Sequence, residues 1–514
     1  MAIKNRKKIG AYTGMMIAGT ALVIVAVILL NSIASMLAGR YEGWYVDMNP
    51  TLRYPASDAF YDYVEDYVIS EVTGDEKIRI VFCEEKETLL ASDETMLVYT
   101  IADELVKAYP DRFAIEHMDP LAQPAKAREY GVTATDDVVV VYGKDENGKE
   151  HSKVCGLAEF YVLDEDSMPT AFRGHRRMAT VLRTVVCKTL PVCYMTLNHG
   201  ETSEIDLEIQ FAVADAGYEI RRLNLLHDGI PEDCDLLVTY NPDRDFTHMD
   251  GTSGRSEIES LRTYMEDGGK YMVFVTADTF AAGGFPNLEG YLAEWGVTFA
   301  HSEGNTGVEE CYLVRDPGHA LATDGYTILA RPSTGEAAEA VLDASVMDGR
   351  AAIYLSNATV IRPSEGFADN GKGQLQKDGT TVTTLLSSYA GAEAWAAGRA
   401  VDRAGEDGYA FMTLSRRTSG DNTGYLLACS AASFAGEAGM QSAVYDNKAV
   451  FLSVVESMGK TDVPLHIQPQ PIQDNTIRTM TTAQARAITW VAVLTPTVAL
   501  LAAGVWVLIR RRYA

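Results

Sequence analysis

The sequence lacks the short motifs that mark nucleotide-hydrolysing and nucleophilic enzymes. It contains no Walker A sequence, so it provides no P-loop route to ATP hydrolysis, and it contains no G-x-S-x-G nucleophile elbow. Gly254 and the glycine pairs at 268–269 and 283–284 do not form a G-x-G-x-x-G after a strand, and we interpret them as helix ends and turns. With no cofactor motif in the sequence, we expect no cofactor.

Cysteine is scarce, and its spacing does not indicate metal binding. The seven cysteines include no C-x-x-C pair, so we expect no zinc site. Several lie inside apolar, strand-like runs, which is typical of core residues. Cys193 lies within such a run and not after it, so it is poorly placed as a nucleophile. Disulfide pairing stays open, because the number of cysteines is odd and an external location permits oxidation.

Basic residues are also in short supply. The chain has 44 Lys and Arg against 71 Asp and Glu, which gives a formal net charge of −27. Seven of the basic residues lie at the two ends, and without them 37 basic residues face 71 acidic ones, a balance of −34. Such a surface repels nucleic acid and anionic lipid, so we expect no nucleic-acid partner. The 514 residues, 47% of them hydrophobic, predict a globular chain with more than one domain.

Charge is absent from two long apolar segments. Residues 9–39 and 487–509 contain no charged side chain. Each segment reaches the roughly 20 apolar residues that a membrane-spanning helix needs, so we predict transmembrane helices over 12–37 and 487–509. A cleaved signal peptide is the alternative for the first segment. Its apolar stretch is too long for that alternative, and no small-x-small cleavage site follows it.

The charges beside these segments predict the orientation in the cell membrane. Basic residues precede the first segment (Lys4, Arg6, Lys7, Lys8) and follow the second (Arg510, Arg511, Arg512). Positive flanks stay in the cytoplasm, so we predict a two-pass protein with both termini cytoplasmic. The large domain between the two helices is then extracytoplasmic.

Between the membrane helices, strand-like and helix-like segments alternate, which predicts an α/β fold. We expect two extracytoplasmic α/β domains, over 38–170 and 191–460. In the first domain, the alternation of strands with helices favours a mostly parallel sheet. The remaining parts are expected to be short cytoplasmic ends at 1–11 and 510–514, a linking helix at 171–190 and a linker at 461–486. The second domain has the order of a doubly wound layer, although the pattern is weak from about 300 to 457. There we expect strands at 351–355 and 425–428, a helix at 447–458 and a loop over 363–379.

A polar stretch follows the first strand of the second domain. The apolar run Val192–Leu197 ends in Asn198-His199-Gly200-Glu201, and in open α/β sheets ligands bind at such strand ends. One interpretation makes His199 and Glu201 a general acid/base pair. The other makes this stretch a strand-to-helix loop, in which Gly200 forms the turn and acidic groups favour the helix start. We favour the loop, which on this interpretation lines a ligand or partner surface.

Two further strands in the same domain also end in polar residues. Asn241 and Asp243 follow the strand DLLVTY, and Asp278 follows the strand YMVFVT. Because parallel strands end at one edge of a sheet, we expect these residues to meet the His199-Gly200-Glu201 loop in one crevice. The set does not define a reaction, and it contains no catalytic or metal-ligating group that we can assign.

The order of segments resembles the GldG family of ABC transport auxiliary proteins, first associated with gliding motility. The resemblance rests on LNHGE, then GYEIRRLNLLHDGIPEDCDLLVTYNPDRDF, EIESLRTYMEDGGKYMVFV and FPNLEGYLAEWGVTF. YPASDAFYDYVEDYV near the start and TMTTAQARAITW near the end also fit. The resemblance implies a second domain similar to flavodoxin-like or class I glutamine amidotransferase-like folds, without the cysteine nucleophile. It implies no catalytic residue.

Two functions of different classes remain open. The first is a non-enzymatic, membrane-anchored auxiliary subunit of an ABC-2-type transporter, with an ABC permease and an ABC ATPase as partners. Its external domains would bind a substrate or a partner. The second is a membrane-anchored cell-surface hydrolase, which requires His199, Glu201 and Asp278 to meet within hydrogen-bond distance.

Overall fold

The structure is a computed structural model. It describes residues 54–144, 150–163, 168–187, 189–203, 207–248, 256–277, 284–303, 309–347, 352–441 and 444–472. Both predicted transmembrane segments, 12–37 and 487–509, lie outside these ranges. Within the ranges, no helix is long and apolar enough to cross a membrane.

The first α/β region is built on a four-stranded sheet with the order β2-β1-β3-β4. Its strands are β1 Ile78–Phe82, β2 Phe113–His117, β3 Val138–Lys144 and β4 Glu150–Cys155. Its helices are α2 Asp58–Tyr67, α3 Lys86–Leu89, α4 Asp93–Ala108, α5 Pro124–Tyr130 and α6 Gly174–Val186. Ser57 caps the first helix, because its side chain accepts a hydrogen bond from the Phe60 N–H.

Only one strand pair of this sheet is parallel, so the prediction of a mostly parallel sheet is wrong for the first region. β1 pairs parallel with β2, whereas β3 runs antiparallel to both β1 and β4. Hydrophobic periodicity reports which face of a strand is buried, but it does not report the direction of the strand.

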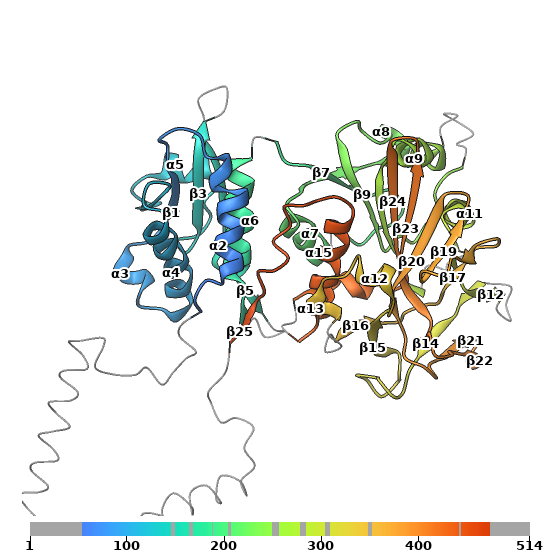
Figure 1. Ribbon diagram of the computed structural model, residues 1–514. Helices are drawn as coiled ribbons and strands as arrows, with labels where there is room; N and C mark the ends of the chain where they lie inside the picture. The colour runs from blue at the N-terminus through green and yellow to red at the C-terminus, as the bar shows by residue number, and fades with distance from the viewer. Residues whose placement is uncertain are drawn as a thin grey trace, which may run out of the picture. The chain divides into compact units, whose positions relative to one another are not determined.

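Helices cover both faces of this first sheet. α2, α4 and α6 share one buried cluster, and α2 and α6 lie side by side (Figure 1). Ala127 and Tyr130 of α5 pack against Val139 and Val141 on the other face. The predicted linking helix, α6, therefore also belongs to the core of the first region. Two short strands, β5 Tyr161–Leu163 and β6 Pro169–Phe172, pair with each other before α6, and β25 Gln470–Pro471 pairs with β6.

The second region begins with five parallel strands in the order β8-β7-β9-β10-β24. They are β7 Val192–Thr196, β8 Glu219–Leu223, β9 Cys234–Tyr240, β10 Lys270–Phe274 and β24 Asn422–Cys429. The helices nearby are α7 Leu207–Asp215, α8 Leu225–Asp228, α9 Glu257–Glu266, α11 Pro286–Glu294, α14 Glu437–Met440 and α15 Asn447–Ser457. α7 and α15 pack on one face of these strands, and α9 and α11 pack on the other. This arrangement is the layer that the sequence predicts.

The sheet continues beyond β24 with antiparallel strands. Among the described residues, the whole sheet has 13 strands. The main path runs through β23 Ala410–Ser419, β20 Thr380–Ser387, β15 Thr327–Pro332 and β16 Ile353–Ser356. β11 Val297–Phe299, β17 Ile361–Pro363, β18 Ala368–Asp369 and β19 Gln374–Lys377 attach to it. The expected loop at 363–379 is thus partly wrong, because β18 and β19 form a hairpin there. Their polar sequence, which is exposed at β18, gives no strand periodicity.

Smaller elements complete the second region. They are the hairpin β12 His301–Glu303 with β13 Glu309–Cys311, the sheet β14 Leu313–Arg315, β21 Glu393–Ala396 and β22 Arg399–Arg403, and the short helices α12 Glu336–Glu339 and α13 Ala344–Met347.

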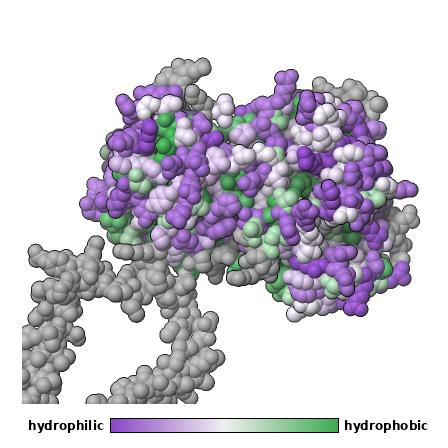
Figure 2. All heavy atoms as spheres, in the orientation of Figure 1, coloured by the Kyte–Doolittle hydropathy of each residue, from purple (hydrophilic) through white to green (hydrophobic). Residues whose placement is uncertain are grey.

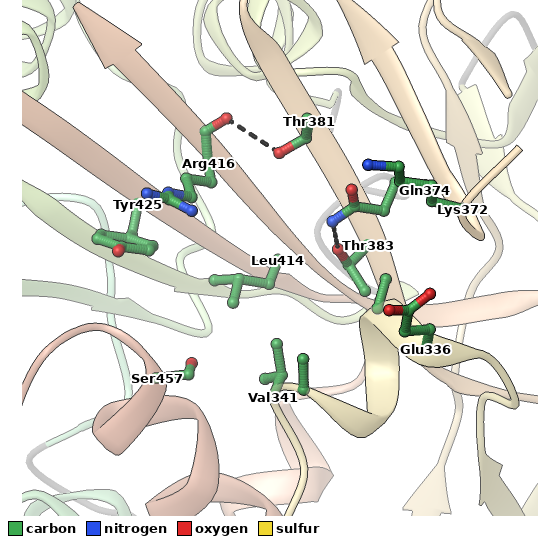
Figure 3. Close-up of a pocket in the computed structure, with 12 residues that line it drawn as sticks. Glu336, Val341, Lys372, Gln374, Thr381, Thr383, Leu414, Arg416, Tyr425 and Ser457 are labelled. Atoms are coloured by element: carbon green, nitrogen blue, oxygen red, sulfur yellow. Dashed lines mark hydrogen bonds between the residues drawn. The ribbon is translucent and has the colours of Figure 1, made fainter. Parts of the chain in front are cut away.

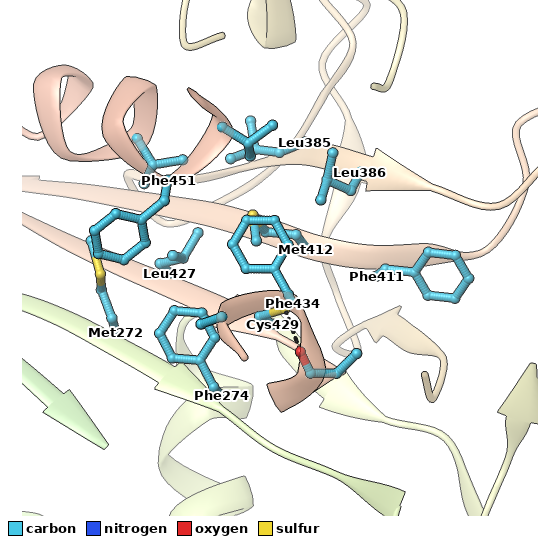
Figure 4. Close-up of a cluster of buried hydrophobic side chains, with 14 of the residues drawn as sticks. Met272, Phe274, Leu385, Leu386, Phe411, Met412, Leu427, Cys429, Phe434 and Phe451 are labelled. Carbon is cyan, nitrogen blue, oxygen red and sulfur yellow. Dashed lines mark hydrogen bonds between the residues drawn. The ribbon is translucent and has the colours of Figure 1, made fainter. Parts of the chain in front are cut away.

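One hydrophobic core joins the parallel and antiparallel halves of the large sheet. Figure 4 shows Phe274 from β10, Leu427 from β24 and Met412 from β23 together with Phe434 and Phe451. These side chains are fully buried. Burying apolar surface contributes about 25 cal/mol per Å², so this shared core holds the 300–457 stretch in the same domain as β7–β10. On the face shown in Figure 2, hydrophilic side chains predominate.

Candidate functional site

The strand order of the parallel layer reverses between β7 and β9. The chain passes from β7 outward to β8 and then returns to β9 on the other side of β7. In open α/β sheets, the crevice outside the carboxyl ends of two such strands is the usual ligand position. The loops that follow β7 and β9 carry His199, Gly200, Glu201, Asn241 and Asp243, so the fold brings five of the six predicted site residues to this point. Asp278 lies outside the described residues.

His199 is clamped between two carboxylates. Its Nδ1 lies 2.9 Å from Glu201 Oε1, and its Nε2 lies 3.1 Å from Glu257 Oε1. No more than 3% of any of these three side chains is exposed. The ring stacks on Phe246 with 3.9 Å between the ring centroids. We name the set His199, Glu201 and Glu257 the histidine clamp.

The clamp ties three chain segments together. The carbonyl oxygen of His199 accepts hydrogen bonds from the backbone N–H groups of Asp243 (2.8 Å) and Arg244 (3.0 Å) in the loop after β9. Glu257, in the first turn of α9, accepts a 2.7 Å hydrogen bond from the Thr247 N–H. Glu201 accepts one from the His199 N–H, also at 2.7 Å. The bonds of His199 and Glu257 therefore join the loop after β7, the segment after β9 and the start of α9, and so close this edge of the sheet.

Gly200 and Asn241 hold the backbone conformations that this closure requires. Gly200 has φ +77°, and a Cβ atom there would lie 1.8 Å from Asp243 Oδ1. Asn241 also has a positive φ, 51°. Its side chain donates to Thr202 Oγ1 at 3.1 Å and accepts from Thr276 Oγ1 at 3.0 Å. Left-handed backbone is costly for residues other than glycine, and here the hydrogen bonds on both sides of Asn241 stabilise it.

The charges of the clamp stabilise one another. Burial of the imidazole lowers its pKa, but hydrogen bonds and charge from Glu201 and Glu257 outweigh burial and raise the pKa of His199 to about 9. Burial raises the pKa of both carboxyls, but hydrogen bonds, the largest of them from His199, and the charge of His199 outweigh burial, so the net pKa of each is lowered. Near neutral pH the clamp is therefore a buried imidazolium between two carboxylates.

This arrangement is unsuited to general base catalysis. A base needs an unprotonated nitrogen within hydrogen-bond distance of a substrate proton. Both nitrogens of His199 already contact carboxylates, one ring face is covered by Phe246, and the raised pKa keeps the ring protonated. Asp243 is 62% exposed and pairs with Arg244 at 3.2 Å, as expected of a solvated loop. In the described part of the chain, no group of three His, Cys, Asp or Glu side chains is arranged so that it could hold a metal ion.

Sequence reasoning missed three members of this site. Glu257 and Phe246 are distant from His199 along the chain, and Asn198 donates a 2.5 Å hydrogen bond to Glu257. Glu257 has the pattern of an ordinary acidic residue in the first turn of a helix, where it complements the helix dipole. No sequence signal distinguishes that role from a buried partner of histidine.

The clamp predicts a pH dependence of stability. His199 has a higher pKa in the folded state, about 9, than its ordinary value of 6.5, so its contribution is complete below pH 6.5 and is lost as the pH rises through 9. The loss amounts to about 3 kcal/mol. The two carboxyls have lowered pKa values, so their contribution is present above the ordinary glutamic-acid range and is lost as the pH falls. Denaturant unfolding of the full chain at several pH values measures both effects.

A His199→Gln variant is the control for this pH dependence. It is expected to lose the decline in stability between pH 6.5 and 9. Burial lowers the pKa of Lys448 to about 8, so the contribution of Lys448 makes stability rise with pH above that value. The variant also contains Lys448, so the difference between wild type and variant excludes this effect. If the wild type and the variant decline equally, His199 is not the titrating group.

No protein-family model matches the chain, and the comparison with curated proteins finds no match. Solved structures align with about half of it at low similarity. The N-terminal domain of mmIFT52 is 12% identical and covers 53% of this chain and 96% of its own, with a TM-score of 0.33. A putative ThuA-like protein from Bacteroides uniformis is 13% identical, covers 48% and 84%, and has a TM-score of 0.26. PurLQS from Thermotoga maritima is 16% identical, covers 52% and 100%, and has a TM-score of 0.25.

Proposed function

We propose that this chain is a non-enzymatic, membrane-anchored auxiliary subunit of an ABC-2-type transporter, similar to the GldG family. On this proposal, 12–37 and 487–509 span the cell membrane and the described α/β regions are extracytoplasmic. An ABC permease and a separate ABC ATPase are its partners, which accounts for a chain without a Walker A sequence.

The observation that carries the non-enzymatic part is the closed histidine clamp. The strand end at which an α/β enzyme would hold its reacting groups is filled by a buried, protonated His199 with both nitrogens engaged. Cys193 supports the same proposal. It lies fully buried inside β7, and burial raises the pKa of its thiol, so it is not a thiolate nucleophile.

We further propose the finer fold assignment for the second region, a flavodoxin-like layer of the glutamine amidotransferase type. The order β8-β7-β9-β10-β24 corresponds to 2-1-3-4-5 in order along the chain, which is the flavodoxin-like arrangement. The fold alone does not define an activity, because such layers hold many unrelated functions. In this chain, the histidine clamp occupies the position at which such a layer usually binds its ligand.

The alternative is a cell-surface hydrolase that uses His199 and Glu201. One contact favours it, because these two side chains meet at 2.9 Å. Glu257 opposes it, since this carboxylate occupies the nitrogen that would have to take a substrate proton. We therefore keep the auxiliary subunit as the proposed function.

Affinity purification from gently solubilised native membranes, followed by mass spectrometry, tests the proposal. We expect an ABC ATPase and a multispanning permease to be recovered in stoichiometric amounts with the tagged full-length chain. An unrelated two-pass membrane protein with the same tag is the control for adhesion. Recovery of the chain alone, under conditions that keep a known ABC complex intact, would contradict the proposal and would favour the hydrolase alternative.

A further inference from the structure

The second region contains a cavity far along the chain from the clamp residues. Its volume is about 450 Å³, within the range of small-molecule sites. It lies between the end of the short helix α12, the last turn of α15 and the strands β20, β23 and β24, with the β19 hairpin at one side (Figure 3). The stretch from 300 to 457 gave the weakest sequence pattern, so sequence analysis did not indicate this site.

The cavity has an apolar centre between polar walls. Leu414 and Val341 form the centre, as Figure 3 shows. Arg416 and Tyr425 lie on one side of them, and Gln374 and Thr383 lie on the other. A few fixed polar groups around an apolar surface are typical of sites that bind and orient a small polar molecule.

The donors on the β19 side are held in place before any ligand binds. Asn370 donates to Gln374 Oε1 at 3.3 Å, and Gln374 Nε2 donates to Thr383 Oγ1 at 2.9 Å. A side-chain amide has two N–H hydrogens, so Gln374 has a second one to offer, and the Thr383 hydroxyl keeps its own hydrogen as a donor. Thr383 is only 4% exposed, which makes it a fixed group and not a surface hydroxyl.

The charged groups of the lining favour an anion. The guanidinium of Arg416 lies 6.0 Å from the ring centroid of Tyr425, and it forms no ion pair with any described residue. Lys372 is the second cation, and Glu336 is the single acidic residue of the lining. An excess of cations is unusual in a chain with a formal net charge of −27. A guanidinium fork matches the geometry of a carboxylate.

We propose that this cavity binds a hydroxylated organic acid of about the size of a sugar acid. Arg416 holds the carboxylate, the Tyr425 ring packs on the carbon skeleton, and Gln374 and Thr383 donate to its oxygen atoms. The proposal does not depend on the transporter assignment, because it rests on the lining of the cavity alone. It identifies a ligand class that neither the clamp nor the membrane segments indicate.

Isothermal titration of the detergent-solubilised full-length chain tests this proposal with matched probes. D-glucuronate and D-galacturonate are compared with D-glucose and D-galactose, which carry a neutral CH2OH group in place of the carboxylate. We expect saturable binding of at least one acid below about 10 mM and at least tenfold weaker binding of the matched neutral sugar, the factor that about 1.4 kcal/mol represents. The affinity should also fall as salt is added, since an ion contact is screened.

Two variants separate the site from a general charge effect. Arg416→Gln is expected to weaken binding of the acid at least tenfold, because it removes a charge-assisted hydrogen-bond donor. Arg399→Gln removes the same charge from an exposed position in β22, outside the lining, and is expected to leave binding unchanged. Equal binding of the acid and its neutral sugar, equal loss in the two variants, or no saturable binding of either acid would overturn the proposal.

Discussion

Replacing His199 with alanine is expected to lower the free energy of unfolding by about 3–5 kcal/mol, the range for breaking a buried ion pair. The variant leaves the carboxylates of Glu201 and Glu257 buried and facing each other across the space of the lost ring. It also removes the ring that stacks on Phe246. Denaturant unfolding of the full chain at a pH below 6.5 and above the ordinary glutamic-acid range, where the contribution of His199 is present, measures the loss.

His227→Ala is the matched control, because 83% of that histidine side chain is exposed. The control is expected to cost less than about 0.5 kcal/mol, as surface substitutions usually do. Adding Glu201→Gln and Glu257→Gln to His199→Ala removes the buried charges and should recover part of the stability. Equal losses for the two histidine variants would show that the clamp does not hold the strand end closed.

Replacing Lys448 with methionine is expected to cost about 3–5 kcal/mol for the same physical reason. Lys448 in α15 forms a buried ion pair with Asp215 at the end of α7. Burial raises the pKa of Asp215, but the charges of Lys448, Arg173 and Arg177 outweigh it and hold the pKa well below its usual range. Without Lys448, a carboxylate remains buried with Arg177 at 3.5 Å as its remaining ion-pair partner.

The double variant Lys448→Met with Asp215→Asn tests the cause of that loss. Exchanging a whole buried ion pair for neutral groups is often close to neutral, so the double variant should regain most of the stability. Unfolding by denaturant, followed by tryptophan fluorescence, gives both values. If Lys448→Met alone is as stable as the wild type, Arg177 is sufficient to balance Asp215, and the pair does not hold α7 against α15.

The parallel layer could be predicted because local pattern and final environment agree there. The apolar runs at β7 and β9 and the polar residues that end them have the signature of buried strands, and the structure places both. Their common edge follows from parallel pairing, so all six site residues were expected to meet, and the structure brings together the five that it describes. The pattern fails at β18 and β19, because polar strands in an added hairpin carry no periodicity that distinguishes them from a loop.

The α/β class, the strand-end position of His199 and the absence of motifs for P-loop or elbow chemistry all follow from the amino-acid sequence. These properties depend on residues that are close along the chain. The contact of Glu257 with His199 and the shared cavity of Arg416 and Gln374 depend on the tertiary fold, because they join segments that are distant in sequence. The two carboxylates then set the protonation of His199. They outweigh the effect of burial and keep the imidazole a cation, whereas the same ring with a free nitrogen would be a base.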